Sequence, residues 1–415
     1  MRMSYLIYEH GDAINGPIVN QKRLLSALHE RGHEIQVLCL FHESSPVHDQ
    51  FREEGFATAR YPAGKYTQET VLWILGQLQS FKPDIFVPDW IAPGAFAARW
   101  LRQAGVPTIG GLRSDDGYFW ALMDVFARPG AGPWALSSVF CVSRELEQRL
   151  NENLSGRTRT CFIPSGVPFP ANVPPKKPPV RMAYLGRIEV RQKQIIETVR
   201  AMCVAARTIE GVTGVLFGNG PDEGQVHKII EEEGCSSAIR LEPPVPPQQL
   251  EARLRDQNVV VLLSDYEGTP GALMDGMANG LVPVCTDCGG GAGALVENGR
   301  TGFVIQDRRE GFVEAIRQLS EQDGLLQEFS ASSRTKIEKG FTISHTVRRW
   351  EELSETLLSR SPMRTTLRMP RTIRLPRKHP DLFGFDYRPP TRKEFFANKC
   401  RIVLGAFKKT LLGRN

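Results

Sequence analysis

Short apolar runs alternate with longer amphipathic stretches over most of the chain. The apolar runs have the length of strands, and the stretches between them repeat apolar positions every three or four residues, as helices packed on a sheet do. In the first part of the chain the predicted strands are 3–8, 34–40, 84–88, 106–110 and 138–142, and the predicted helices are 17–32, 92–104, 117–127 and 143–152. Strands that alternate with helices of this length indicate a parallel, doubly wound α/β sheet.

The alternation stops at residues 164–179, where seven of sixteen residues are proline. Proline lacks a backbone donor and fixes φ, so this stretch continues neither a helix nor a central strand. A second alternating series begins directly after it. The predicted strands there are 181–185, 212–217, 238–241, 259–263 and 282–285, and the predicted helices are 191–208, 221–233, 247–254, 270–279, 309–321, 323–338 and 342–359.

These patterns predict two Rossmann-like domains joined by a hinge. The expected boundaries are an N-terminal domain at 1–165, a proline-rich linker at 166–180, a C-terminal domain at 181–340, a closing helix at 341–360 and a basic tail at 361–415. Open parallel sheets bind ligands beyond the carboxyl ends of their strands. We therefore expect the two sheets to face a cleft that holds a ligand between the domains.

Charge is divided unevenly along the chain. Residues 361–415 hold 14 Lys/Arg and 3 Asp/Glu, a net charge of +11, whereas residues 1–360 hold 38 Lys/Arg and 43 Asp/Glu, a net charge of −5. An acidic body argues against a nucleic-acid partner. Within the tail, 361–380 lacks periodicity and is expected to be a disordered linker. Residues 393–412 combine apolar positions at helical spacing with lysines, which predicts a helix that lies on an anionic membrane or docks on protein.

Other broad features exclude several classes. No apolar run reaches the roughly 18–20 residues of a membrane-spanning helix, and the first apolar run is too short for the core of a signal peptide. The eight cysteines are scattered, which favours reduced thiols over disulfides, and Cys285 and Cys288 form a single Cys-x-x-Cys, too little for a zinc site. We expect a cytoplasmic protein.

The candidate chemistry lies where strands of the second domain end. Glu267 and Asp275 follow strand 259–263, one on a loop and one about a turn into the next helix. Such carboxylates either accept hydrogen bonds from vicinal hydroxyls or complement a helix dipole. Arg187 and Lys193 follow strand 181–185. Cations at this edge of a sheet suit a diphosphate, although a solvated loop has the same composition.

Glycine-rich turns follow two further strands. Gly289, Gly290 and Gly291 precede a short helical pattern, where bare backbone N–H groups make either an anion cradle or a flexible turn. Gly218 and Gly220 follow strand 212–217 and allow either close approach of a ligand or a tight turn.

Six motifs in residues 181–305 together resemble one known family. The motifs are Leu185-Gly-Arg-Ile followed by Lys193, Phe217-Gly-Asn-Gly-Pro, Tyr266-Glu-Gly-Thr-Pro, Met277-Ala-Asn-Gly-Leu-Val-Pro-Val, Thr286-Asp-Cys-Gly-Gly and Leu295-Val-Glu-Asn-Gly-Arg-Thr-Gly-Phe. They are similar to the donor-binding domain of retaining, nucleotide-sugar-dependent glycosyltransferases of the GT-B type, the family-four group. Weaker similarity covers the rest of the chain to about residue 360.

The resemblance implies a role for each matched position. Arg187 and Lys193 would neutralise the donor diphosphate, Glu267 would hold hydroxyls of the donor sugar, and Asp275 would hold the ribose. Further donor contacts are implied for Asn15, Gly16, Gly186, Gly218, Gly268, Thr269, Pro270, Gly271, Gly289 and Gly290. The family implies a nucleotide-diphosphate sugar as co-substrate, with no separate cofactor and no metal.

Two positions depart from the family pattern. Asp275 stands where the family usually has Glu, and Arg113 falls where many relatives have a His close to the reacting sugar. A guanidinium cannot act as a base, but it can stabilise a phosphate or a carboxylated substrate. Arg113, Asp115 and Asp116 are therefore candidates for contacts with the acceptor or substrate. The two aspartates are equally suited to capping the helix predicted at 117–127.

The resemblance implies front-face transfer of a sugar, with retention, to a hydroxyl of a polysaccharide or lipid-linked glycan. The clamped leaving diphosphate would assist deprotonation of the acceptor, so catalysis would be mainly electrostatic and positional. Arg113 keeps open a second reading, a non-catalytic sensor or scaffold that binds nucleotide sugars. A nicotinamide oxidoreductase is disfavoured because no Gly-x-Gly-x-x-Gly follows the first strand of either domain. The sequence also lacks the cofactor lysine or phosphate site that a glycan phosphorylase needs.

Overall fold

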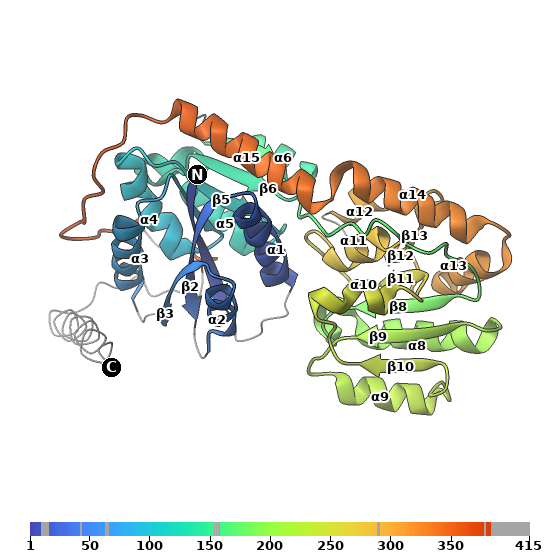
Figure 1. Ribbon diagram of the computed structural model, residues 1–415. Coiled ribbons are helices and arrows are strands. Elements are labelled where there is room, and N and C mark those ends of the chain that lie inside the picture. The colour runs from blue at the N-terminus through green and yellow to red at the C-terminus, as the bar shows by residue number, and fades with distance from the viewer. Residues whose placement is uncertain are drawn as a thin grey trace, which may run out of the picture.

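A computed structural model of the chain describes residues 1–9, 16–41, 44–62, 66–152, 154, 156, 158–288, 291–376 and 379–382. The described residues form two lobes, each built around one parallel sheet (Figure 1). The last long helix runs from the C-terminal lobe back over the N-terminal lobe, where it is drawn in orange. Two Rossmann-like sheets in one chain confirm the predicted fold class.

The sheet of the N-terminal lobe has seven strands in the order β3-β2-β1-β4-β5-β6-β7 among the described residues. The strands are β1 (Arg2–Glu9), β2 (Glu34–Phe41), β3 (Ala57–Pro62), β4 (Ile85–Asp89), β5 (Thr108–Leu112), β6 (Ser138–Cys141) and β7 (Arg159–Phe162). The helices are α1 (Gly16–Glu30), α2 (Pro46–Glu53), α3 (Thr67–Phe81), α4 (Ala92–Gln103), α5 (Gly117–Phe126), the 3-10 turn η1 (Pro129–Trp134) and α6 (Arg144–Asn151).

The sheet of the C-terminal lobe has the order β10-β9-β8-β11-β12-β13, again counted over the described part of the chain. Its strands are β8 (Arg181–Leu185), β9 (Thr213–Phe217), β10 (Ile239–Glu242), β11 (Val259–Leu262), β12 (Val282–Thr286) and β13 (Phe303–Ile305). The helices are α7 (Val190–Lys193), α8 (Ile195–Thr208), α9 (Glu223–Glu232), η2 (Pro247–Gln249), α10 (Leu250–Leu254), α11 (Gly271–Ala278), α12 (Ala292–Leu295), α13 (Glu310–Glu321) and α14 (Leu325–Gly340).

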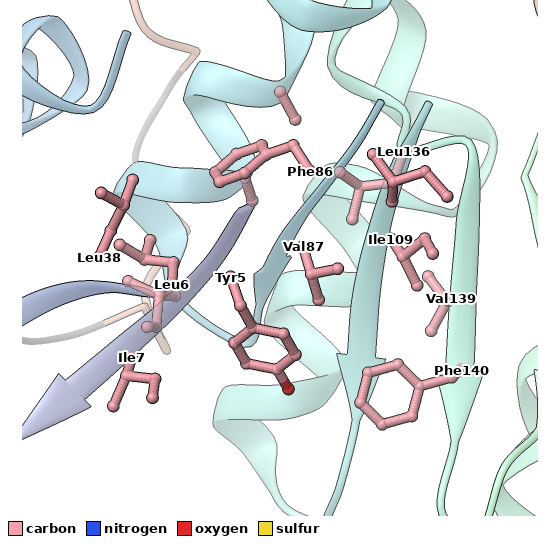
Figure 2. Packing of buried hydrophobic residues seen from close by; sticks show 14 of the residues in the cluster. Tyr5, Leu6, Ile7, Leu38, Phe86, Val87, Ile109, Leu136, Val139 and Phe140 are labelled. Carbon is pink, nitrogen blue, oxygen red and sulfur yellow. The ribbon is translucent and has the colours of Figure 1, made fainter. Parts of the chain in front are cut away.

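The central strands of both sheets are buried along their length, as expected for sheets covered on two faces. Figure 2 shows this packing in the N-terminal lobe, where side chains of β1, β4, β5 and β6 fill the space beside the sheet. The edge strands differ. β3 and β7 contain no fully buried residue, so they carry no continuous apolar run, and the sequence pattern missed them for this reason.

The helix expected at 191–208 is interrupted. It is divided into α7 and α8 by Gln194, whose φ of 49° is left-handed. A non-glycine residue adopts this conformation only at a cost, which the surrounding structure must offset. The break separates Lys193 from the helix axis of α8 and leaves it on the loop side of the sheet.

Helix α15 (Ile343–Arg360) completes the core of the N-terminal lobe. The Trp350 ring lies 5.0 Å from Phe140 of β6 and 6.4 Å from Tyr5 of β1. On the surface, Arg31 Nε donates to Glu351 Oε1 at 2.8 Å, and this ion pair lowers the pKa of the Glu351 carboxyl. The chain therefore passes between the lobes twice, once at the proline-rich linker and once through α15.

The residues after α15 pack along the N-terminal lobe without helix or strand (Figure 1). The Thr365 N–H donates to the Ala104 carbonyl at 3.0 Å. Apolar side chains of this segment contact the lobe core: Leu367, Ile373, Leu375 and Leu382. This placement differs from the disordered linker expected at 361–380, because apolar residues at irregular spacing leave no periodic signal. The helix predicted at 393–412 lies outside the described residues.

The cysteines and the helices bear on two broad expectations. Seven cysteines there are free thiols, six of them buried. None of the described helices combines the length and the apolar character that a bilayer span needs.

Candidate active site

Lys193 and Glu267 meet at the carboxyl edge of the C-terminal sheet. Lys193 ends α7, which follows β8, and Glu267 lies on the loop after β11, the strand next to β8. Parallel neighbours end at the same edge, so their loops come together. Lys193 Nζ lies 2.6 Å from Glu267 Oε1, and the two side chains are 17% and 9% exposed. The Glu267 N–H donates to the Cys288 carbonyl at 3.1 Å, which joins the loop after β12 to the same cluster.

Backbone and side-chain contacts fix α7 against the loop after β11. The Asp265 N–H donates to the Gln192 carbonyl at 3.0 Å, and Gln192 Nε2 donates to the Tyr266 carbonyl at 2.9 Å. Arg308 forms an ion pair with Asp265 from the far side. These contacts within the protein fix the positions of Lys193 and Glu267 relative to each other.

Arg187 lies on the same loop as Lys193 but is far more open. Its side chain is 58% exposed, and NH1 lies 3.0 Å from Glu189 Oε2. The Arg187 carbonyl accepts a hydrogen bond from the buried Tyr184 hydroxyl at 2.7 Å, which fixes the backbone at this point.

Glycines in the loops after the strands of the C-terminal sheet lie close against one another. Gly186 and Gly218 lie against each other, since a Cβ at Gly218 would overlap the Gly186 carbonyl oxygen. Packing of the protein's own backbone thus requires glycine at 218, whatever its part in binding. Gly291 donates its N–H to the Gly268 carbonyl at 2.6 Å, so the turn after β12 lies beside the loop after β11. Asn15, Gly289 and Gly290 lie outside the described residues.

The loop after β11 also forms the contact between the lobes. A Cβ at Gly268 would lie 2.5 Å from the carbonyl oxygen of Arg113. Thr269 Oγ1 donates to the Val142 carbonyl at 3.4 Å. Pro270 is the residue before α11, and Gly271, the first of that helix, faces Asn20 of α1. Gly16, at the start of α1, is exposed.

Asp275 of α11 is paired across the same junction. Arg23 NH2 lies 3.0 Å from Asp275 Oδ1, and NH1 donates to Oδ2 at 3.2 Å. Burial raises the pKa of the Asp275 carboxyl, and the nearby Arg23 guanidinium opposes this effect. The side chain predicted to hold ribose therefore contacts the N-terminal lobe.

Arg113 directly follows β5, and its guanidinium has several partners within the N-terminal lobe. Its Nε donates to Asp89 Oδ1 at 2.9 Å, and its NH2 donates to Asp89 Oδ2 at 2.8 Å and to the Tyr5 hydroxyl at 2.9 Å. Gln21 Nε2 donates to the same carboxylate at 2.9 Å. The Arg113 guanidinium also lies over the Phe140 ring, 4.8 Å from its centroid. Arg113 is thus the charge partner of a carboxylate with no exposed surface.

Asp115 and Asp116 have protein partners of their own. Asp116 is the N-cap of α5 and accepts a hydrogen bond from the Phe119 N–H at 3.2 Å. Asp115 accepts a hydrogen bond from Trp120 Nε1 at 2.6 Å and pairs with Arg149. The capping interpretation of Asp116 agrees with this geometry.

Asp89 and Arg23 are the charged residues at this junction that the sequence analysis missed. Asp89 ends the apolar strand β4, and a polar residue at the end of an apolar strand is the same signal that pointed to Glu267. Its φ of 51° is left-handed, which is uncommon outside glycine and often marks functional positions. Arg23 lies within a helix and offers no comparable signal.

Two further features bear on where a ligand could bind. A hollow of about 300 Å³ lies beside the linker and α10, and none of its lining residues is a predicted site residue. Within the described residues, no group of three or more His, Cys, Asp or Glu side chains is placed to hold a metal ion.

The fold and the arrangement of the site define the class to which the chain belongs. Residues 169–336 match the family described as glycosyl transferases group 1, and residues 15–166 match the glycosyl transferase 4-like domain. The two matches follow each other along the chain and cover both lobes. The chain belongs to the GT-B glycosyltransferases of the family-four type.

Curated relatives are more distant. The chain is 24% identical over 228 residues to an exopolysaccharide phosphotransferase of Streptomyces coelicolor, covering 54% of this chain and 24% of the relative. It is 28% identical over 143 residues to a GDP-mannose:cellobiosyl-diphosphopolyprenol alpha-mannosyltransferase of Xanthomonas campestris, covering 34% and 37%. A poly(glycerol-phosphate) alpha-glucosyltransferase of Bacillus subtilis is 25% identical over 211 residues, covering 49% and 30%. The matches span well under half of each relative's length.

Solved structures resemble the whole body. A glycosyltransferase from Rickettsia africae has a TM-score of 0.69 at 14% identity, covering 87% of this chain and 99% of that chain. HepE from Anabaena in complex with UDP has a TM-score of 0.67 at 14% identity, covering 86% and 100%. At this identity the likeness shows the fold.

Proposed function

We propose that this chain transfers a sugar, with retention and without a metal, from a nucleotide-diphosphate sugar to an acceptor hydroxyl. The observation that carries the proposal is the Lys193–Glu267 pair at the meeting point of the loops after β8, β11 and β12, where the C-terminal lobe contacts the N-terminal lobe. Family membership and the Anabaena structure with bound UDP support a nucleotide sugar as donor.

In the proposed reaction, two cationic side chains lie beside the negatively charged leaving group. Lys193, whose ammonium is held by Glu267, and Arg187, whose exposed guanidinium can turn, would neutralise the diphosphate as the glycosidic bond breaks. These two cations supply the charge stabilisation that a divalent metal supplies in other transferases, and this is why we propose a metal-independent reaction. Glu267 would accept hydrogen bonds from hydroxyls of the donor sugar through its second oxygen. The diphosphate oxygen nearest the acceptor would take its proton.

The proposed acceptor is a polysaccharide or lipid-linked glycan on the cytoplasmic side of a membrane. The relatives in Xanthomonas and Bacillus carry names that specify a diphosphopolyprenol-linked acceptor and poly(glycerol-phosphate). The basic residues 393–412 would hold the enzyme on anionic lipid, because such helices combine apolar burial with charge attraction.

The first experiment screens uridine, guanosine and adenosine diphosphate sugars by thermal shift. A ligand selective for the folded state raises the melting temperature. The best donor is then incubated with the protein in the presence and absence of EDTA, and the anomeric configuration of the released or transferred sugar is followed by NMR. We expect turnover that EDTA leaves unchanged and a product with the configuration of the donor. Inversion, or loss of turnover on chelation, would contradict the mechanism.

Arg113 favours one alternative function, a non-catalytic sensor of nucleotide sugars. Its guanidinium is committed to Asp89 and Tyr5 and cannot exchange a proton at neutral pH. The same donor assay separates the two functions. Binding by calorimetry without any hydrolysis or transfer would support the sensor, whereas turnover would support the enzyme.

The membrane proposal has its own test. Because residues up to 382 pack on the body, a truncation after 382 removes the tail without stripping the lobe, whereas a truncation after 360 removes both. We expect full-length protein to sediment with phosphatidylglycerol-containing liposomes and the 1–382 protein to stay in solution. Equal sedimentation of the two proteins would contradict the proposal.

A further inference from the structure

Two charged side chains from opposite lobes form a largely buried ion pair. Arg23 is on α1 of the N-terminal lobe, and Asp275 is on α11 of the C-terminal lobe. Two guanidinium nitrogens face the two carboxylate oxygens at 3.0 and 3.2 Å, and the side chains are only 11% and 14% exposed. This parallel arrangement is the bidentate geometry that makes arginine–carboxylate pairs specific.

The pair is held by a fixed helix. Asn20 of α1 faces Gly271 of α11, and Arg23, about one turn later, contacts Asp275. Gln21 anchors α1 to Asp89 in the core. α1 therefore holds Arg23 in a fixed position facing the C-terminal lobe.

A contribution to the stability of the fold does not by itself explain this ion pair. Removing two charges from water costs about as much as their attraction returns, so a buried ion pair is weak evidence for a role in stability. The Arg23 Nε–H is buried and has no hydrogen-bond partner among the described residues. Buried donors are rarely left unpaired, so this N–H has capacity for a further polar partner at the junction.

The carboxylate has capacity left for a ligand. An ionised carboxylate offers about four lone-pair sites, and Arg23 takes one on each oxygen. Two sites remain for a pair of vicinal hydroxyls. The other charged residues nearby have partners elsewhere: Lys22 of α1 pairs with Glu54, and Arg334 of α14 contacts the Ala278 carbonyl at the last residue of α11.

We propose that Arg23 is a positioning residue for the donor site: it orients the Asp275 carboxylate toward the nucleoside diphosphate, so that the site in the C-terminal lobe is completed by the N-terminal lobe. This inference rests on the proposed function and adds a residue to it. The donor and the junction between the lobes are then coupled, because the group that holds the nucleoside is itself held by the opposite lobe.

The test measures binding of UDP, GDP and ADP to the full-length protein by calorimetry and then follows the tightest of the three. Arg23→Gln should weaken that nucleotide by about tenfold or more, the loss expected when a charge-assisted contact is removed. Arg23→Lys keeps the charge but loses the bidentate contact, so it should retain only part of the affinity and fall between Arg23→Gln and the wild type. Lys22→Gln removes the same charge from the same helix on its other side and should bind like the wild type.

Two results separate positioning from a general effect on the fold. In an Asp275→Asn background, Arg23→Gln should cause little further loss, because partners in one network are not additive. Unchanged or tighter binding in Arg23→Gln, with normal thermal unfolding, would overturn the inference and leave the proposed function standing. If the wild-type protein binds none of the three nucleotides, the proposed function fails and this inference fails with it.

Discussion

Gly268 of the C-terminal lobe lies directly against the backbone of Arg113 in the N-terminal lobe. A single methyl group on this glycine would reach to 2.5 Å from the Arg113 carbonyl oxygen. Backbone atoms at the end of a strand cannot move aside as a flexible side chain can. This close approach of the two lobes therefore requires that residue 268 have no side chain.

Replacing Gly268 with alanine should separate the lobes without unfolding either of them. We expect activity on the donor selected by the thermal-shift screen to fall by roughly a hundredfold, because a shift of about 1 Å at a reacting centre has effects of that size. Gly293→Ala in α12 is the matched control, since a Cβ there meets nothing within 4 Å. Equal activities of the two variants would show that the closed contact is not needed for transfer.

Lys193→Ala removes the half-buried cation beside Glu267. A lost charge-assisted contact is worth roughly 1.5–3 kcal/mol, so transfer should fall by at least roughly tenfold. The exposed Arg191 on the same short helix provides the comparison, and Arg191→Ala should keep near wild-type rates. Steady-state rates with the best donor decide the matter, and unchanged donor turnover in Lys193→Ala would refute the assignment.

Arg113→Met leaves the Asp89 carboxylate buried without its counter-charge. Breaking a buried pair in this way costs about 3–5 kcal/mol of folding free energy, which urea unfolding detects as a lower midpoint. Adding Asp89→Asn removes the orphaned charge and should recover a large part of the loss. A midpoint that Arg113→Met does not move would mean that water or another group neutralises Asp89.

Lys176 in the proline-rich linker predicts an unusual dependence of stability on pH. Its ammonium donates to the Arg255 carbonyl at 2.9 Å, and burial lowers its pKa from 10.5 to about 8. Between these two values the unfolded chain keeps a proton that the folded protein has lost. The free energy of unfolding should therefore rise with pH across this window.

The comparison that isolates this effect is with Lys176→Met, measured by urea unfolding from pH 7 to pH 10. The wild-type protein should gain stability relative to the variant as the pH rises above about 8. A constant difference between the two proteins over this range would show that Lys176 titrates as an ordinary lysine.

The sequence was sufficient to predict those parts of the fold in which apolar strands alternate with amphipathic helices. Alternating runs revealed the central strands and most helices, and polar residues at strand ends pointed to Lys193 and Glu267, which the structure places 2.6 Å apart. Both residues follow neighbouring strands of one sheet, so sequence order and sheet geometry together bring them close. The edge strands β3 and β7 lack buried residues and could not be found in this way.

Contacts that depend on strand order or on the placement of the lobes could not be predicted from the sequence. Tyr5, Asp89 and Arg113 converge because β4 lies between β1 and β5, an order that periodicity does not encode. The pairing of Arg23 with Asp275 further requires that two domains meet in one orientation. Arg23 and Asp275 are 252 positions apart, and no local pattern relates them.

Helix α15 has a consequence for how the protein is made. The core of the N-terminal lobe includes Val347, Trp350 and Leu382, all of which follow the entire C-terminal lobe in the chain. Synthesis proceeds from the N-terminus, and domains usually fold as they emerge. Here the lobe that leaves the ribosome first lacks part of its interior until nearly the whole chain has been translated, so its completion is a late event in biogenesis.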